Sequence, residues 1–268
     1  WQSYQKLSLF LNLNTTLNSI VPFFFIFLIK LNAIDSTNDF LKQLATSHIL
    51  ENYTVVSTEN QLKGRGQMGS IWTSELGKNL TFSIYLANSL KNIDSIYNLN
   101  VAVAIAILEV LKKQNIPELK VKWPNDIMSA NKKVGGILIE NAIKNSNEIQ
   151  SIIGIGLNVN QRNYDGLPQA TSLCLTTGQF FDCEELLTKI VEQLEFNVGL
   201  IIQNRSEALW EKYHQFLYKK DIPSAFENKK GIQFMGIIKQ VIANGQLEVI
   251  LEDDSLQLFN IKELKMFN

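Results

Sequence analysis

The pattern of apolar residues changes once along this chain, near Lys219, and this change constrains the fold more than any other feature. Before Lys219, β-branched segments such as YTVVSTEN (53–60) alternate with helical segments such as the unbroken apolar stretch 97–114. After Lys219, glycines separate short segments in which apolar and polar residues alternate, which is typical of a small antiparallel barrel. We therefore predict an α/β (α+β) domain with a mixed sheet and helices, followed by a small β-barrel.

Further segments of the first unit have patterns that predict their structure. Residues 35–39 provide a helix N-terminus, because Ser36 or Asp35 can cap the N–H groups that a first turn leaves unpaired. We expect two paired strands on either side of a polar turn at 145–147, and two amphipathic helices after them. The expected elements are strands at 25–31, 53–60, 81–87 and 119–128, the strand pair 132–144 and 148–160, and helices at 97–114, about 182–203 and 205–218.

The N-terminal segment is the least regular part of the sequence. Residues 20–29 read IVPFFFIFLI, an apolar run shorter than the about 20 residues that cross a bilayer. Its second half leads into IKLNAIDSTND, so we predict a core strand over 25–31 and no membrane association. Residues 1–20 are either an ill-ordered extension or the product of an upstream start, and a membrane anchor is the less favoured alternative. The predicted units are 1–24 (extension, disordered at least in part), 25–218 and 219–268.

The charge of the chain argues against nucleic acid as a partner. Lys and Arg number 25 and Asp and Glu number 26, so the formal net charge is −1 and no global basic field is present. Nearly all of the positive charge is lysine, since the arginines are Arg65, Arg162 and Arg205. With so few arginines in the chain, we interpret the position of Arg65 within a glycine-rich stretch as a sign of function.

Cysteines and histidines indicate no metal site or catalytic triad. Cys174 and Cys183 lack the spacing of metal ligands, and they fit the reduced thiols of a cytoplasmic protein. His48 and His214 lie in separate helical segments, where ordinary structural roles are the simpler interpretation.

Residues 63–72 read KGRGQMGSIW, a segment suited to close contact with an anion. Glycines let the backbone turn tightly and leave N–H groups facing a ligand, and the forked guanidinium of Arg65 suits phosphate. Trp72 could stack on a flat ring. No GK[ST] closes the segment as in a Walker loop, and it leads into a strand and not a helix, unlike the dinucleotide fingerprint. Taken alone, the glycine content favours a flexible surface loop.

Two lysine-containing segments follow. KWPNDIM (122–128) places a carboxylate, Asp126, just past a strand, where it could hold Mg²⁺ between phosphates, although Pro-Asn-Asp is also ordinary turn chemistry. KKVGGILIE (132–140) places Lys133 before two glycines, so that its charge can point into a cleft beside an exposed backbone. A hairpin with solvated lysines explains the second segment equally well.

GIGLNVN (154–160) has the pattern of a strand that leaves room for something to lie against it. Gly154 and Gly156 carry no side chains, and Asn158 offers an amide edge.

Each signal is weak alone, but their order and spacing resemble the catalytic domain of biotin–protein ligases. The order is STN, a strand ending in Gln61 before GRG, Trp72, KWPND, K-x-G-G and GxGLNVN, over about residues 31–217. The segment from 219 onward resembles the small SH3-like C-terminal barrel of that family. The resemblance implies a fold related to class II aminoacyl-tRNA synthetases. It also implies ATP-dependent ligation of biotin to a lysine of a biotin carboxyl-carrier domain through biotinyl-5′-AMP.

The resemblance assigns roles in binding biotin and its adenylate. Ser36, Thr37 and Gln61 would bind the ureido ring of biotin. Arg65, with the glycines on either side of it, would bind the carboxylate and phosphate of biotinyl-AMP. The complete predicted set of substrate-binding residues is Ser36, Thr37, Asn38, Gln61, Gly64, Arg65, Gly66, Gln67, Trp72, Lys133, Gly135, Gly136 and Asn158.

The resemblance also assigns catalytic roles to Arg65, Lys133 and Asp126. Lys133 would neutralise phosphate charge during adenylation, and Asp126 would help to place Mg²⁺ or the incoming lysine. Trp72 would pack near the adenine and Asn158 would contact its edge. The small molecules implied are ATP and biotin as substrates, with Mg²⁺.

The sequence departs from the family in two respects. Many members have further arginines in the glycine-rich loop, where this chain has Gln67, Met68 and Ser70, so we expect the loop to hold biotinyl-AMP less tightly. Some members begin with a helix-turn-helix domain, for which nothing before Asp35 has the pattern, so we predict no DNA binding. We expect a cytoplasmic protein that is a monomer or a weak homodimer.

Two alternative functions remain at this point. A lipoate–protein ligase shares the fold, although the GRG loop with KWPND favours biotin. A non-catalytic biotin-binding protein is the alternative outside enzymes, and the loss of arginines from the loop is its only support.

Overall fold

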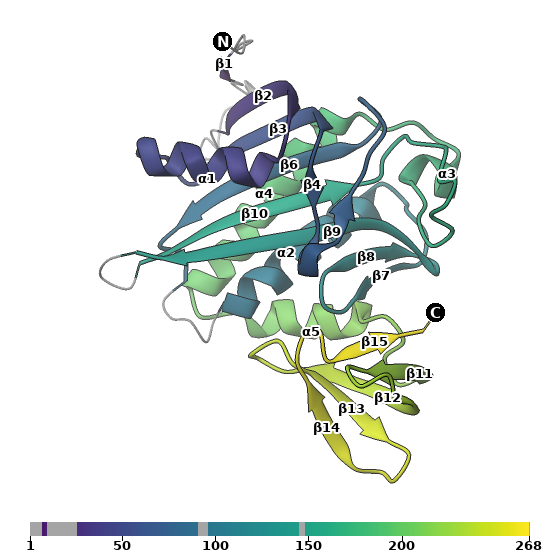
Figure 1. Ribbon diagram of the computed structural model, residues 1–268. Coiled ribbons are helices and arrows are strands. Elements are labelled where there is room, and N and C mark those ends of the chain that lie inside the picture. Colours follow the sequence, from purple (N-terminus) through teal and green to yellow (C-terminus); the bar gives the residue numbers. More distant parts are fainter. Residues whose placement is uncertain (1–6, 10–25, 91–95, 145–147, 268) are drawn as a thin grey trace, which may run out of the picture.

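The computed structural model describes residues 7–9, 26–90, 96–144 and 148–267, and in these residues an eight-stranded mixed sheet forms the centre of the larger unit (Figure 1). Strands β2 and β3 are parallel, and every other neighbouring pair in this sheet is antiparallel. In spatial order the strands are β1 (Leu7–Leu9), β2 (Phe27–Ile34), β3 (Thr54–Gln61), β6 (Leu80–Ala87), β10 (Ile149–Leu157), β9 (Lys132–Ile143), β8 (Asp126–Ser129) and β7 (Leu119–Lys122).

Helices cover both faces of this sheet (Figure 1). Because side chains alternate between the faces of a strand, neighbours such as Ile152 and Ile153 belong to different cores. Ile153 packs with the core that contains α2, whereas Ile152 packs with Leu41 of α1. Helix α2 is apolar on all sides because it lies between the sheet and another helix, α4. The helices are α1 (Thr37–Ser47), α2 (Ile96–Lys113), α3 (Leu173–Thr177), α4 (Cys183–Ile202) and α5 (Glu207–Phe216).

The mixed α/β fold predicted from the sequence is confirmed, with differences at several element ends. The strand predicted over 25–31 is β2, which begins at Phe27, and Phe25 lies outside the described residues. Of the predicted extension 1–24, the structure describes only Leu7–Leu9, which pairs with β2. The turn at 145–147 also lies outside the described residues. Within the described residues, no helix has both the length and the apolar character needed to cross a membrane.

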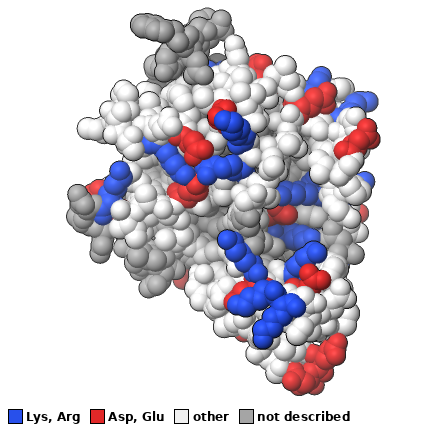
Figure 2. Space-filling model, viewed as in Figure 1, with Lys and Arg blue, Asp and Glu red and all other residues white. Residues whose placement is uncertain are grey.

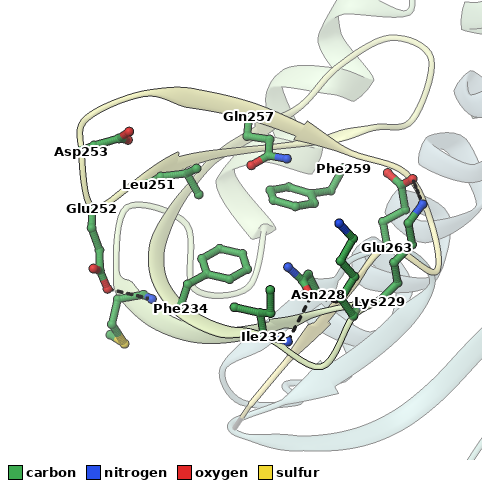
Figure 3. Close-up of a pocket in the computed structure, with 12 residues that line it drawn as sticks. Asn228, Lys229, Ile232, Phe234, Leu251, Glu252, Asp253, Gln257, Phe259 and Glu263 are labelled. Carbon is green, nitrogen blue, oxygen red and sulfur yellow. Dashed lines mark hydrogen bonds and ion pairs between the residues drawn. The ribbon is translucent and has the colours of Figure 1, made fainter.

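The C-terminal segment forms a five-stranded antiparallel sheet, consistent with the predicted SH3-like barrel. Its interior contains a stack of Phe226, Phe234 and Phe259. Phe234 and Phe259 also line an open cavity of about 580 Å³ (Figure 3). In spatial order the strands are β14 (Leu256–Phe259), β13 (Leu247–Leu251), β12 (Gln233–Val241), β11 (Pro223–Asn228) and β15 (Leu264–Met266).

The turn between β12 and β13 joins the C-terminal sheet to the larger unit. The buried Trp123 donates a hydrogen bond from its indole N–H to the carbonyl oxygen of Gly245, at 2.9 Å. Gly245 has a φ of +90°, and a Cβ at this position would lie 2.2 Å from the ring of Tyr97. His214 Nε2 lies 2.9 Å from the carbonyl oxygen of Val241, at the start of the same turn. The C-terminal sheet is therefore fixed against the residues that precede the Asn125-Asp126 turn.

We expect Gly245→Ala to destabilise the protein by about 3 kcal/mol, because it combines an unfavourable φ with overlap of the Tyr97 ring. Gly231→Ala is the matched control, because Gly231 has a φ of +77° but no atom within 4 Å of the added Cβ. The control should lose only about 1 kcal/mol. Urea unfolding of both variants measures the difference, and equal losses would show that contact with Tyr97 contributes nothing.

Candidate functional site

The face of the central sheet that carries α1 becomes hollow at one end, because its side chains become small there. Along β10 the residues on this face run from Ile152 to Gly154 and Gly156. Their partners on β6 are Tyr85 and then two much smaller residues, Ser83 and Thr81. A sheet keeps its backbone hydrogen bonds without side chains, so the glycines open space above it without interrupting it.

A cavity of about 310 Å³ occupies this hollow and contains most of the predicted site residues. Its walls come from the start of α1, the end of β3, the hairpin of β4 (Gly64–Arg65) and β5 (Ile71–Trp72), the Asn125-Asp126 turn and the middle of β9 and β10. The predicted residues that line it are Ser36, Thr37, Asn38, Gln61, Arg65, Gly66, Gln67, Trp72, Asp126, Lys133 and Gly136. The larger cavity in the C-terminal sheet contains none of them.

The start of α1 is held over the cavity by hydrogen bonds to two strands. Ser36 caps the helix by accepting from the backbone N–H of Asp39, as its sequence position predicted. The backbone N–H and the hydroxyl of Thr37 both lie within hydrogen-bond distance of Gln61 Oε1, at 2.9 and 3.2 Å. Ser83 Oγ lies 2.7 Å from Thr37 Oγ1 and is buried beneath it. The STN segment and Gln61 are therefore one connected polar group.

The glycine-rich loop forms a short hairpin across the mouth of the cavity. Gly64 pairs with Trp72, and a Cβ on Gly64 would lie 2.2 Å from the carbonyl oxygen of Trp72. The ring of Trp72 lies over Gly156, where an added Cβ would be 2.5 Å from it. The indole N–H of Trp72 and Oε1 of Gln67 are buried without a hydrogen-bond partner. Unpaired buried polar atoms are costly, so these two atoms are suited to contacts with a polar ligand.

The guanidinium of Arg65 is held by carboxylates at one end of the cavity. Its Nη2 lies 2.5 Å from Asp39 and 3.4 Å from Glu140, and Glu140 also pairs with Lys42. Burial acts to raise the pKa of Glu140, but hydrogen bonds from Lys42 and Asn38 and the charges of Lys42 and Arg65 outweigh it, so the pKa is lowered. Figure 2 shows acidic and basic side chains side by side on this face. Charges at this end are thus closely balanced.

The Asn125-Asp126 turn and Lys133 form the other end of the cavity. Lys133 Nζ lies 2.6 Å from Asp126 Oδ1. The turn is fixed to β9 because Asn125 Nδ2 donates to the carbonyl oxygen of Ile137 at 2.8 Å. No group of three or more Asp, Glu, His or Cys that could hold a metal occurs in the part of the chain that the structure describes. The donor set therefore fits Mg²⁺ only as one carboxylate supplemented by substrate phosphates and water.

Comparison with known proteins shows which family the residues of this site resemble. The model of the biotin/lipoate A/B protein ligase family matches residues 31–158, a range that includes the hairpin, the Asn125-Asp126 turn and the glycines of β9 and β10. The matched range is slightly less than half of the chain, and within it the chain is similar to this family.

Relatives extend this similarity along most of the chain. The bifunctional ligase/repressor BirA of Escherichia coli is 28% identical over 231 residues, covering 84% of this chain and 69% of that protein. Biotin–protein ligase 1 of Arabidopsis thaliana is 27% identical over 261 residues, covering 91% and 68%. The biotin protein ligase of Aquifex aeolicus, solved in complex with biotin and ATP, is 25% identical with a TM-score of 0.74, covering 90% of this chain and 98% of that one.

Three residues predicted for the ligase site do not line the cavity. Asn158 is buried, and its amide N–H donates to the carbonyl oxygen of Thr171 at 3.0 Å, so it fixes the loop that contains Thr171. Its predicted contact with adenine stays a prediction. Gly64 and Gly135 allow a neighbouring strand to pack closely against the backbone. A Cβ on Gly135 would lie 2.9 Å from the carbonyl oxygen of Gly156. Sequence patterns predicted no role in the site for the following cavity or network residues: Ser70, Ile71, Thr81, Phe82, Ser83, Ile137, Leu138, Glu140 and Ile155.

The lowered pKa of Glu140 predicts how acid affects the stability of this network. A carboxyl whose pKa is lower in the folded than in the unfolded state contributes stability above its unfolded value near 4.5, and this contribution is lost as the pH falls through the lowered value. Glu140→Gln should therefore lower the free energy of unfolding at pH 7. Its deficit should shrink as the pH falls below about 4.5, because the protonated glutamic acid comes to resemble glutamine.

Urea unfolding at several pH values tests this prediction. Glu59→Gln is the control, because Glu59 is exposed on β3 and should contribute little at any pH. A Glu140→Gln deficit that stays constant from pH 7 to pH 3 would contradict the proposed ion-pair network.

Proposed function

We propose that this protein joins biotin to a lysine of an acceptor protein at the expense of ATP, through biotinyl-5′-AMP. The observation that carries the proposal is the convergence of Arg65 and Lys133 on one cavity whose wall includes the STN segment and Gln61. Relatives along most of the chain are named biotin–protein ligases, and the Aquifex aeolicus relative was solved with biotin and ATP. A biotin carboxyl-carrier domain is the proposed acceptor. The absence of DNA binding, the oligomeric state and the cytoplasmic location stay predictions.

In the proposed complex the polar group at the start of α1 recognises biotin. Thr37 and Gln61 already fix each other's orientation, so their remaining donors and acceptors face the cavity without further ordering. A ureido ring offers two N–H donors and one carbonyl acceptor, which match hydroxyl and amide groups of this kind. The apolar side chains of Trp72 and Leu138 would pack against the hydrocarbon part of the ligand.

The first chemical step is adenylation. The biotin carboxylate oxygen attacks the α-phosphorus of ATP, and the bond to the β-phosphate bridge breaks as pyrophosphate departs. Arg65 and Lys133 face the phosphoryl group from the two ends of the cavity and would stabilise the charge that grows on its oxygens. Mg²⁺ held by Asp126 and the substrate phosphates would supply further positive charge there. Lys133 must then exchange its ion pair with Asp126 for a phosphate contact.

The second step transfers biotin to the acceptor. The lysine nitrogen attacks the acyl carbon of the mixed anhydride, AMP leaves, and the amine loses a proton. A free lysine is protonated at neutral pH because its pKa is about 10.4, so a carboxylate near the site must orient it or accept the proton. Asp126 is the carboxylate at the cavity wall beside the proposed phosphate site, and we assign this role to it. The hairpin of Gly64–Trp72 would keep water from the anhydride.

We expect Arg65→Ala and Lys133→Ala each to reduce biotin-dependent exchange of pyrophosphate with ATP by roughly 10²-fold or more, because each removes a charge from the transition state. Matched controls are Arg162→Ala and Lys132→Ala, since both residues are exposed and neither lines the cavity. The controls should keep nearly wild-type exchange.

The same exchange assay tests which acid the protein activates and whether the protein is catalytically active. Biotin should support exchange, and lipoate at the same concentration should not. Exchange with lipoate alone would replace the proposal with a lipoate–protein ligase. Exchange that survives in both Arg65→Ala and Lys133→Ala would remove the phosphate roles.

A further inference from the structure

A buried serine lies beneath the polar group at the start of α1. Ser83 on β6 is fully buried, and its hydroxyl oxygen lies 2.6 Å from Asn38 Oδ1 and 2.7 Å from Thr37 Oγ1. A serine hydroxyl has one hydrogen, so it can donate to only one of these two oxygens. The other contacts of Asn38 and Thr37 fix which of them receives it.

The side-chain amide of Asn38 is held in one orientation. Its Nδ2 donates to the carboxylate of Glu140 at 2.7 Å and lies 3.4 Å from the carbonyl oxygen of Leu138. Both of these groups are acceptors, so the reversed amide would place its oxygen against theirs. Asn38 Oδ1 therefore faces Ser83 as an acceptor that has no hydrogen, and the Ser83 hydroxyl must donate to it.

The direction of the Ser83 hydroxyl fixes that of Thr37 in turn. Because Ser83 donates to Asn38, its oxygen can only accept from Thr37, and the Thr37 hydroxyl hydrogen points to it across 2.7 Å. If Thr37 donated to Gln61 Oε1 instead, two hydroxyl oxygens would lie 2.7 Å apart with no hydrogen between them, which is the length of an ordinary O–H···O bond. The distance left without a hydrogen is then the longer one of 3.2 Å, from Thr37 Oγ1 to Gln61 Oε1.

This chain of hydrogen bonds gives the cavity wall a defined pattern of donors and acceptors. Thr37 Oγ1 offers only lone pairs to the cavity, because its hydrogen is engaged by Ser83. Gln61 offers the hydrogens of its Nε2, since its Oε1 accepts from the backbone N–H of Thr37 at 2.9 Å. The ligand that complements this pair has an N–H donor beside a carbonyl acceptor, as in a cyclic urea.

We propose that Ser83 is a positioning residue that sets this pattern through Thr37, and thereby makes the cavity prefer a cyclic urea to a ring that lacks the N–H. The inference rests on the proposed function, in which the ring is the ureido ring of biotin. Ser83 does not line the cavity, so it acts on the ligand only through the direction of one hydroxyl hydrogen. A ring oxygen in place of the N–H would face a lone pair of Thr37 that cannot turn into a donor.

The test compares biotin with its two cyclic carbamates, in which oxygen replaces one or the other ring N–H. In the exchange assay with the full-length wild type, we expect the carbamate that lacks the N–H at Thr37 to have a KM about 100-fold or more above that of biotin. In Ser83→Ala the Thr37 hydroxyl can rotate and donate to the ring oxygen, so this KM ratio should fall about tenfold. The kcat with biotin should change much less than the ratio.

Ser151→Ala is the matched control for loss of a buried hydroxyl. Ser151 lies on the neighbouring strand β10, is buried, donates to Asn141 Oδ1 at 2.7 Å and does not line the cavity. This variant should keep the wild-type ratio at a similar loss of melting temperature.

A double variant tests whether Ser83 acts through Thr37. Thr37→Val should lose the preference for biotin over the carbamate by itself, and adding Ser83→Ala should change the ratio no further. A wild-type ratio in Ser83→Ala, or a further loss in the double variant, would overturn the inference.

A second measurement does not depend on activity. Neutron diffraction from deuterated crystals of the ligand-free protein should show the deuterium of Thr37 directed at Ser83 Oγ and that of Ser83 directed at Asn38 Oδ1. A Thr37 deuterium directed at Gln61 or into the cavity would overturn the inference. Absence of biotin-dependent exchange in the wild type would instead refute the proposed function, and the neutron experiment would still determine the direction of the Thr37 hydroxyl.

Discussion

The architecture of the site depends on the absence of side chains at Gly154 and Gly156 in the middle of a buried sheet. The space above each glycine is filled by a side chain of the protein itself. Asn38 lies over Gly154, and Trp72 lies over Gly156. The first contact fixes the start of α1, and the second fixes the end of the hairpin. Because both walls of the cavity rest on the same strand, a Cβ at either glycine would displace a wall as well as fill space.

Both ends of the cavity pair a cation with carboxylates, but the extent of the network differs. Arg65 lies within a network in which carboxylates offset the cations, so it offers directed hydrogen bonds more than net charge. Lys133 lies at the other end, where its ammonium group pairs with a single carboxylate, that of Asp126.

Local patterns in the sequence predicted the main elements but not the contacts between them. Helix α2 was predictable because its apolar residues form an unbroken stretch, whereas α3 has only five residues and left no periodic pattern. The glycines at 64 and 66 are predicted ligand contacts, and in addition each lies where a side chain would overlap the hairpin itself. Such close approaches depend on how the chain folds back, which a linear pattern does not contain.

The functional residues show the same division. Gln61, Arg65 and Lys133 could be predicted because they belong to recognisable segments. Ser83 and Glu140 could not, because each is an ordinary residue of a strand whose importance comes from partners 46 and 75 positions away, Thr37 and Arg65. Asn158 belongs to a recognisable segment, yet its amide is engaged by a neighbouring loop. Recognisable segments therefore predicted where the site lies better than they predicted which groups each side chain contacts.

The hydrogen bond from Trp123 to Gly245 connects the C-terminal sheet to the chain segment that leads into the cavity wall. Separation of the two units would break this hydrogen bond and expose the Tyr97 ring to water, so the junction resists opening. Trp123 lies three residues before Asp126, so the small sheet is attached next to the turn that positions a carboxylate at the cavity wall. The two units should accordingly behave as one cooperative body, in which a disturbance far from the cavity alters the alignment of reacting groups.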